Sequence, residues 1–205
     1  MKKNLETRTF SAELEAREEG RNGIIIGRPI VYNSRTDLGY FDEVIEPGAL
    51  DGADLSDVRL CLNHDTDYVY ARSRRNNPNS TMRLSVDMNG MQTEADLDLD
   101  APASRNLYSA VGRGDLDKMS FMFSIEDEEW EGLDTDHPLR HIRKIGSVVE
   151  VSIVTFPAYD ATSIDIARSK ETLERAKLEL ESARRSNAEV ETSELELLKE
   201  KLKLY

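Results

Sequence analysis

Three polar side chains stand in or beside apolar stretches of this sequence, and together they could catalyse acyl transfer. They are His64, Ser120 and Glu150. Acyl transfer by a serine needs a hydroxyl nucleophile, an imidazole that takes its proton, and an acid that orients the imidazole and stabilises its charge. With three histidines and 40 acidic residues among 205, the chain offers many such triples by chance. Each residue therefore keeps a second interpretation, as an ordinary structural polar group.

The stretch around Ser120 predicts a strand that could hold a nucleophile in place. Side chains at alternate positions point to opposite faces of a strand, so Ser120 lies on the face away from the apolar side chains. The apolar face holds Met119, Phe121, Phe123 and Ile125. A strand with such a face packs on the core, and a rigid element of this kind suits a nucleophile that must be positioned closely.

His64 and Glu150 also follow from strand patterns. Residues 58–62 predict a strand whose apolar face His64 continues at the strand end. Residues 148–156 predict another strand, in which Glu150 and Ser152 share the face opposite Val149, Val151 and Ile153. The three candidates would thus come from three different strands.

Two other chemistries are less well supported around His64. The sequence His64-Asp65-Thr66-Asp67 contains possible metal ligands, but no second histidine is near in sequence, and an acidic turn is the simpler interpretation. Strand alternation points Cys61 away from His64, which argues against a cysteine nucleophile. We expect no metal and no cofactor.

The remaining pattern predicts an α+β chain made mainly of strands. The turn at 87–90 joins two alternating segments, and a proline near residue 100 opens a helix that the glycines at 112 and 114 end. Residues 126–138 are expected to form an acidic loop around Trp130. The other predicted strands are 7–14, 22–32, 81–86, 91–99, 139–145 and 148–156.

From about residue 161 the composition changes to Glu, Lys, Leu and Ala without glycine, which favours helix. Apolar residues spaced three and four apart form a seam, but Ser186 and Asn187 interrupt it and the later leucines have another phase. We therefore expect two helical pieces in a charged, loosely attached tail, with packing of a solvated helix on its own domain as the alternative.

Composition excludes several partners and compartments. The chain has 27 basic and 40 acidic residues, a formal charge of −13, so its field repels nucleic acid and anionic lipid. Cys61 is the only cysteine, which rules out an intramolecular disulfide and fits a reducing compartment. No apolar run approaches the length of a membrane span. We expect a cytoplasmic protein without nucleic acid or membrane partners.

Four segments in their order resemble the prohead maturation proteases of tailed bacteriophages: Leu62–Asp65, Asn89–Met91, Gly114–Phe123 and Glu150–Tyr159. The resemblance covers about residues 8–165 and implies a protease domain at 1–165 followed by the tail at 166–205. Because that family is related to the herpesvirus assemblin proteases, the resemblance also implies a closed or nearly closed β-barrel flanked by helices. The resemblance implies no cofactor.

The resemblance assigns a role to each candidate residue. It makes Ser120 the nucleophile, His64 the general base and Glu150 the third member of the triad. The related assemblins use a second histidine as third member, so His141 is the alternative. Met122 stands where the family commonly has glycine, and because it shares the Ser120 face it could narrow substrate choice.

For the oxyanion hole the resemblance points only to backbone amides after the Glu150 strand. Ala158 and Tyr159 are the candidates, since Pro157 has no N–H to donate.

The implied function is cleavage of scaffold inside the procapsid, in the cytoplasm of the bacterial host. The implied partners are a separate scaffold protein, or the major capsid protein with its scaffold segment. Self-cleavage and self-association are further expectations. The alternative function is a non-catalytic assembly or scaffold factor that retains the protease fold, for which the long charged tail would be the main element.

Overall fold

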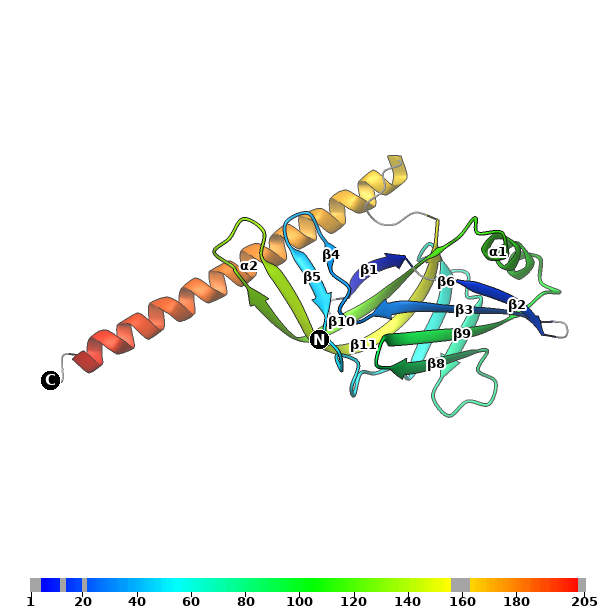
Figure 1. Cartoon of the computed structure of the whole chain (residues 1–205), viewed down its shortest axis with the longest axis horizontal. Helices are drawn as coiled ribbons and strands as arrows, with labels where there is room; N and C mark the ends of the chain where they lie inside the picture. Colours follow the sequence, from blue (N-terminus) through cyan, green and yellow to red (C-terminus); the bar gives the residue numbers. More distant parts are fainter. Residues whose placement is uncertain (1–4, 12–13, 20–21, 156–162, 203–205) are drawn as a thin grey trace.

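The computed structural model describes residues 5–11, 14–19, 22–155 and 163–202 (Figure 1). These residues form eleven strands and two helices, which confirms the α+β class with mainly strands. The strands are β1 (Glu6–Ser11), β2 (Glu15–Glu19), β3 (Asn22–Val31), β4 (Thr36–Asp37), β5 (Asp42–Ile45), β6 (Asp57–Leu62), β7 (Ala71–Arg74), β8 (Met82–Asp87), β9 (Gly90–Asp98), β10 (Lys118–Glu131) and β11 (Leu139–Val154). The helices are α1 (Pro102–Gly112) and α2 (Ser163–Leu202).

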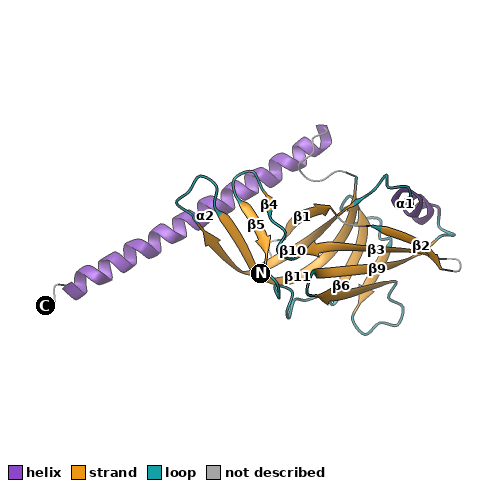
Figure 2. Cartoon of the chain, in the orientation of Figure 1, coloured by secondary structure: helices purple, strands orange, loops and turns teal. Residues whose placement is uncertain are grey.

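β11 is the central strand of the larger sheet. It pairs antiparallel with β10 on one edge, and in parallel with β5 near its start and β6 near its end on the other. β1 borders β10, β4 borders β5 and β7 borders β6, which completes seven strands. A second sheet has the order β2-β3-β9-β8 (Figure 1). Figure 2 shows that strands make up most of the molecule beside the two helices. The three strands that carry the candidate residues, β10, β11 and β6, are therefore neighbours.

The part of the chain that the structure describes does not form a closed barrel, where the resemblance implied a closed or nearly closed one. In the described residues no strand ladder links the seven-stranded sheet to the four-stranded one. β7 and β8 come close, but the link there is made by a loop residue: Thr81 N donates to Arg72 O, and Arg72 N donates to the Thr81 hydroxyl, both at 3.0 Å. These isolated hydrogen bonds do not extend into a strand ladder, so β7 and β8 remain in separate sheets.

The core lies where apolar faces of the two sheets meet. Met119, Phe121 and Phe123 of β10 are buried, as the alternating pattern predicts. Helix α1 packs beside β2, β3 and β9, and buries Leu107 and Val111. One face of β10 is therefore held in the core, and Ser120 lies on the opposite face of the strand.

The predicted acidic loop at 126–138 is wrong at 126–131 and right at 132–138. β10 continues to Glu131 and forms a long hairpin with β11, so only residues 132–138 connect the strands. Acidic side chains of β10 form ion pairs with basic side chains of β11, between positions that are diagonal neighbours in the register. The ion pairs are Glu126 with Lys144, Glu128 with Arg140 and Glu129 with Arg143. Opposite charges on paired strands stabilise the hairpin that the acidic composition alone had hidden.

Other strand boundaries also differ from the prediction. The single strand expected at 7–14 ends at Ser11, and β2 begins at Glu15. The two strands expected at 139–145 and 148–156 form one strand, β11, which passes through Gly146 without a break. Register shifts against β10 absorb the irregularity, and a Cβ at Gly146 would come within 3.0 Å of the Ser124 hydroxyl.

The tail is one helix, α2, rather than the two pieces expected. Ser186 and Asn187 lie within it on exposed positions, and the Asn187 amide donates to Glu191 one turn later (3.0 Å). Polar residues on a solvated face do not interrupt a helix, which explains why the broken seam did not produce a break. Of α1 and α2, neither has the length and apolar composition needed to cross a membrane.

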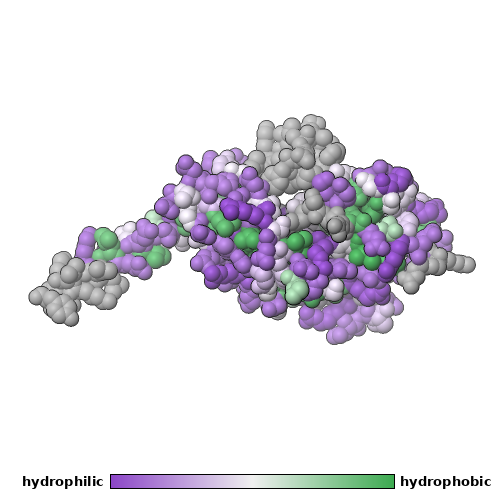
Figure 3. Space-filling model, in the orientation of Figure 1, coloured by the Kyte–Doolittle hydropathy of each residue, from purple (hydrophilic) through white to green (hydrophobic). Residues whose placement is uncertain are grey.

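Part of α2 packs on the large sheet, and the rest projects from it (Figure 1). Ala176 and Leu180 are buried against Leu38 and Phe41 in a second, small apolar cluster. Beyond that contact the projecting end carries exposed apolar side chains among charged ones (Figure 3), including Val190 and Leu195.

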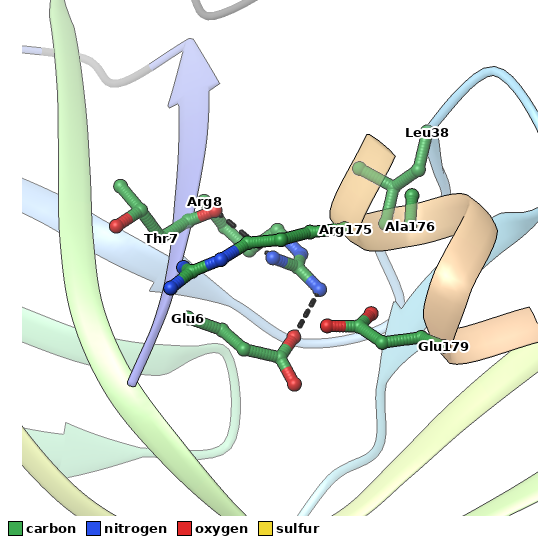
Figure 4. A pocket seen from close by; sticks show the side chains of 7 residues that line it. All are labelled: Glu6, Thr7, Arg8, Leu38, Arg175, Ala176 and Glu179. Atoms are coloured by element: carbon green, nitrogen blue, oxygen red, sulfur yellow. Dashed lines mark hydrogen bonds and ion pairs between the residues drawn. The ribbon is translucent and has the colours of Figure 1, made fainter. Parts of the chain in front are cut away.

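A group of buried charges completes the attachment of α2. Arg8 of β1 donates to Glu43 of β5 (2.5 and 2.8 Å) and to Glu6, and Arg140 of β11 donates to Glu179 of α2 (3.0 Å). Figure 4 shows Glu6 and Arg8 from β1 and Glu179 from α2 pointing toward one another. Charges removed from water need such partners, so the helix and the sheet are coupled here.

Candidate active site

The strand register places the candidate residues on one face of the large sheet. Ser120 of β10 lies opposite Ser152 of β11, and Ser152 lies beside Cys61 of β6. In the next row, Met122 lies opposite Glu150. Paired residues of neighbouring strands point to the same side of a sheet, so Ser120, Ser152 and Glu150 share a face.

His64 reaches this face through a tight turn at the end of β6. The strand ends at Leu62, and Asn63 and His64 both take left-handed backbone conformations, with φ of 53° and 60°. The imidazole Nδ1 lies 2.8 Å from Oε2 of Glu150. The Glu150 side chain is 3% exposed and that of His64 18%. A carboxylate on Nδ1 favours the proton there and leaves Nε2 as the nitrogen that can accept a proton.

Asn63 anchors the turn to the end of β11. Its backbone N–H donates to the carbonyl of Ile153 (2.9 Å), and its side-chain oxygen accepts from the N–H and the hydroxyl of Thr155 (2.9 and 3.1 Å). Asparagine tolerates the left-handed conformation better than most residues. The resemblance included Asn63 only as a neighbour of the histidine, and its tie to Thr155 depends on strand register.

Ser152 belongs to the site, although no role was predicted for it from the sequence. Its hydroxyl donates to Oε1 of Glu150 and accepts from the backbone N–H of His64 (3.0 Å). Two signals in the sequence pointed to it: the alternation that put Ser152 on the same face as Glu150, and its place in the Glu150–Tyr159 segment of the resemblance.

Ser120 is placed on the right face, but its hydroxyl is directed elsewhere. The residue is fully buried, and Oγ donates to the backbone carbonyl of Arg8 in β1 (2.7 Å). A serine hydroxyl has one proton to donate, so in this structure that proton is directed to β1 and not to His64. Attack by Ser120 would require its side chain to turn and substrate to reach it.

The other candidates lie apart from the contact between His64 and Glu150. His141 is near the start of β11, whereas Glu150 is near its end, and its ring nitrogens face Glu46 (2.6 Å) and Glu131 (3.4 Å). Ala158 and Tyr159, the candidates for the oxyanion hole, lie outside the described residues.

The acidic turn after His64 has an ordinary structure. The Asp65 side chain accepts the backbone N–H of Asp67 (3.0 Å), and both residues are exposed. Burial and the nearby carboxylate of Glu150 raise the pKa of the Cys61 thiol to about 11. A thiol with that pKa is protonated at neutral pH, so Cys61 is a poor nucleophile.

One surface group in the described residues has ligand atoms close enough together to hold a metal ion. It consists of Asp37, Asp42 and His137. Arg35 forms an ion pair with Asp42 (2.5 Å), and His137 Nε2 lies 3.1 Å from the same side chain. Asp37 lies in β4, Asp42 in β5 and His137 just before β11, so the group is near the start of β11 and not at His64. It takes no part in the candidate active site.

Comparison with known proteins gives one match. No curated protein and no solved structure matches the chain. A family model described as caudovirus prohead serine protease matches residues 10–177, which include all of the candidate residues. Such a family indicates a serine peptidase with a role in capsid maturation. The chain therefore belongs to the caudovirus prohead serine protease family.

Proposed function

We propose that this chain is a serine endopeptidase that cleaves scaffold inside the procapsid, with Ser120, His64 and Glu150 as its catalytic residues. The substrate is a separate scaffold protein or the scaffold segment of the major capsid protein, and the protease also cleaves itself. The observation that carries the proposal is the contact between His64 Nδ1 and Glu150 (2.8 Å), on the face that bears Ser120 and within the family match. We also propose that the fold of this chain is related to that of the assemblin proteases.

In the proposed mechanism each residue has one task. His64 Nε2 takes the proton of the Ser120 hydroxyl as Oγ attacks the scissile carbonyl carbon, and later returns it to the leaving amine. Water then releases the acyl group by the same route. Glu150 holds the ring in the required tautomer and stabilises the imidazolium that forms. Backbone amides of Ala158 and Tyr159 are the proposed donors to the oxyanion.

The position of Ser120 supports latency before assembly. Its hydroxyl is buried and donates to Arg8, so an enzyme in this conformation would not attack peptide bonds. Latency has a clear benefit, because free activity would destroy scaffold before the procapsid forms. Activation would turn the Ser120 side chain away from β1 and toward His64 and admit substrate.

The test is cleavage of the chain's own capsid protein. The full chain and its Ser120→Ala and His64→Ala variants are each expressed with a major capsid protein and scaffold from the same phage, and the assembled particles are run on a gel. We expect truncated products with the wild type only, because nucleophile and base act as one unit. Shortening of the protease itself in the same lanes tests self-cleavage.

A matched control separates chemistry from folding. Ser124 is also a buried serine of β10, and its hydroxyl pairs with that of Ser147 (2.8 Å) away from His64. Ser124→Ala should therefore leave cleavage intact. Normal cleavage by Ser120→Ala would refute the proposed nucleophile. Absence of cleavage in every lane, with normal particles, would favour the alternative of a non-catalytic assembly factor, which the burial of Ser120 also supports.

A further inference from the structure

The Ser152 hydroxyl joins the two residues that face each other in the candidate site. It is fully buried on β11, directly opposite Ser120 and beside Cys61. Its oxygen accepts the backbone N–H of His64, and its proton goes to Oε1 of Glu150. The directions are fixed, because a backbone N–H can only donate and an ionised carboxylate can only accept.

Glu150 depends on this hydroxyl for its orientation. One carboxylate oxygen faces His64 Nδ1, and the other accepts from Ser152. A carboxylate with a partner on each oxygen cannot rotate without losing one of them. The hydrogen bond from Ser152 therefore sets the plane of the Glu150 carboxylate, in which Oε2 faces the imidazole.

His64 depends on the same hydroxyl for its backbone. The residue has a φ of 60°, which costs a non-glycine residue free energy unless its neighbours hold it. On either side the turn is closed by backbone bonds, from Asn63 N to Ile153 O (2.9 Å) and from Asp65 N to Leu62 O (3.0 Å). At His64 the acceptor is a side chain, the hydroxyl of Ser152.

We propose that Ser152 is a positioning residue, which aligns the Glu150 carboxylate and the His64 turn for proton transfer. This inference rests on the proposed function, since it assigns Ser152 to the same reaction. Ser152 does not touch substrate in this role and acts only through its two neighbours. Loss of its hydroxyl should leave Ser120 and substrate binding in place but misalign the base.

The kinetic test uses Ser152→Ala in the full chain. Its substrate is a peptide that spans the cleavage site found with the capsid protein. We expect kcat to fall about 10- to 100-fold, as for other groups that orient a reacting side chain, with KM nearly unchanged. Ser147→Ala is the matched control, another buried serine of β11 that bonds Ser124 instead, and it should keep the wild-type kcat. A loss as complete as that of Ser120→Ala would make Ser152 a reacting group and overturn the proposal.

A second measurement does not require activity. In a Ser120→Ala background, NMR follows the Nδ1 proton of His64 and the exchange of its backbone amide with solvent. Ser152→Ala should remove the low-field ring signal and accelerate amide exchange at least tenfold, whereas Glu150→Gln should affect mainly the ring signal. If both signals survive Ser152→Ala, positioning is refuted even for an active enzyme. If both are lost while the wild type cleaves nothing, the proposed function fails and the positioning stands.

Discussion

Glu150 and His141 are the two candidates for the third member of the triad, and their contacts lead to different expectations. Glu150 contacts His64, whereas His141 contacts Glu46 and Glu131. We predict that Glu150→Gln lowers kcat by about a hundredfold to ten-thousandfold, because the amide no longer favours the right tautomer or stabilises the imidazolium. His141→Ala should cost less than tenfold. Both rates are measured on the cleavage-site peptide.

Equal melting temperatures of the two variants would show that chemistry and not folding is being compared. The assignment is wrong if the effects exchange, with His141→Ala inactive and Glu150→Gln near normal. That result would mean a triad with two histidines, as in the assemblins.

At the level of single elements, Gly90, where the β8–β9 hairpin enters β9, shows how one residue can hold two paired strands together, here β9 and β3. Gly90 has a φ of +131°, and a Cβ there would lie 2.0 Å from the carbonyl oxygen of Ile30. Backbone cannot move away as the tip of a side chain can. We predict that Gly90→Ala destabilises the fold by about 4 kcal/mol or more, since clash adds to backbone strain. Urea unfolding measures the loss.

Gly52 provides the matched control, because its φ is also positive but no atom approaches it closely. Its φ is +80°, and nothing lies within 4 Å of an added Cβ. Gly52→Ala should cost only about 1–2 kcal/mol, the price of the left-handed backbone. If the two variants unfold at the same urea concentration, contact with Ile30 is not what requires glycine at 90.

Local patterns predicted this hairpin and the apolar face of β10, because alternation and turn residues are read within a few positions. The β10–β11 hairpin was missed beyond Ile125, since it depends on ion pairs such as Glu126 with Lys144 between strands. Likewise the sequence offered both Glu150 and His141 to His64. The contact with Glu150 follows from the parallel pairing of β6 with the end of β11, which no local pattern specifies.

For the molecule as a whole, α2 is more closely joined to the sheets than its composition indicated. The sequence predicted a loosely attached tail from residue 166 onward, with packing of the helix on its own domain as the alternative. Arg184 also bonds the carbonyls of Leu133 and Thr135 in the β10–β11 loop (2.9 and 2.6 Å). Contacts between a helix and a distant loop depend on tertiary structure, and the broken seam gave no sign of them.

These contacts predict where the tail can be removed. A chain that ends at residue 186 keeps the packing on Phe41 and should melt within a few degrees of the full chain. A chain that ends at residue 165 exposes Leu38 and Phe41 and takes Glu179 from Arg140, so it should melt at a clearly lower temperature. Calorimetry makes the comparison.

Truncation at residue 186 should also separate peptide hydrolysis from entry into procapsids. The chain that ends at 186 should hydrolyse peptide normally yet fail to enter procapsids, if the projecting end docks with scaffold. A chain that ends at 165 and melts like the full protein would contradict this account and restore the separate tail.

The buried charges beneath α2 also predict a dependence on pH. Burial, and then the negative charge of Glu6, raise the pKa of Glu179 to about 7. Burial would also raise the pKa of Glu6, but Arg8 and Arg140 lower it overall. Glu179 is thus the carboxyl that takes up a proton in the docked state. Because the pKa of Glu179 is higher in the docked state than in the unfolded chain, protonation of Glu179 stabilises docking. This stabilisation is complete below the pKa of the unfolded chain, about 4.5, and is lost as the pH rises through about 7.

Trp130 can report this loss, since it is the only tryptophan in the chain and packs on Phe41 in the cluster that α2 covers. Between pH 5.5 and 8.5 we predict a shift of its emission to longer wavelength, centred near pH 7, with faster proteolysis within α2. Glu179→Gln should abolish the transition, because an amide does not titrate. Glu196→Gln, on the exposed part of the same helix, should retain it. An unchanged transition in Glu179→Gln would assign the pH dependence to another group, and α2 would then be held independently of the Glu179 charge.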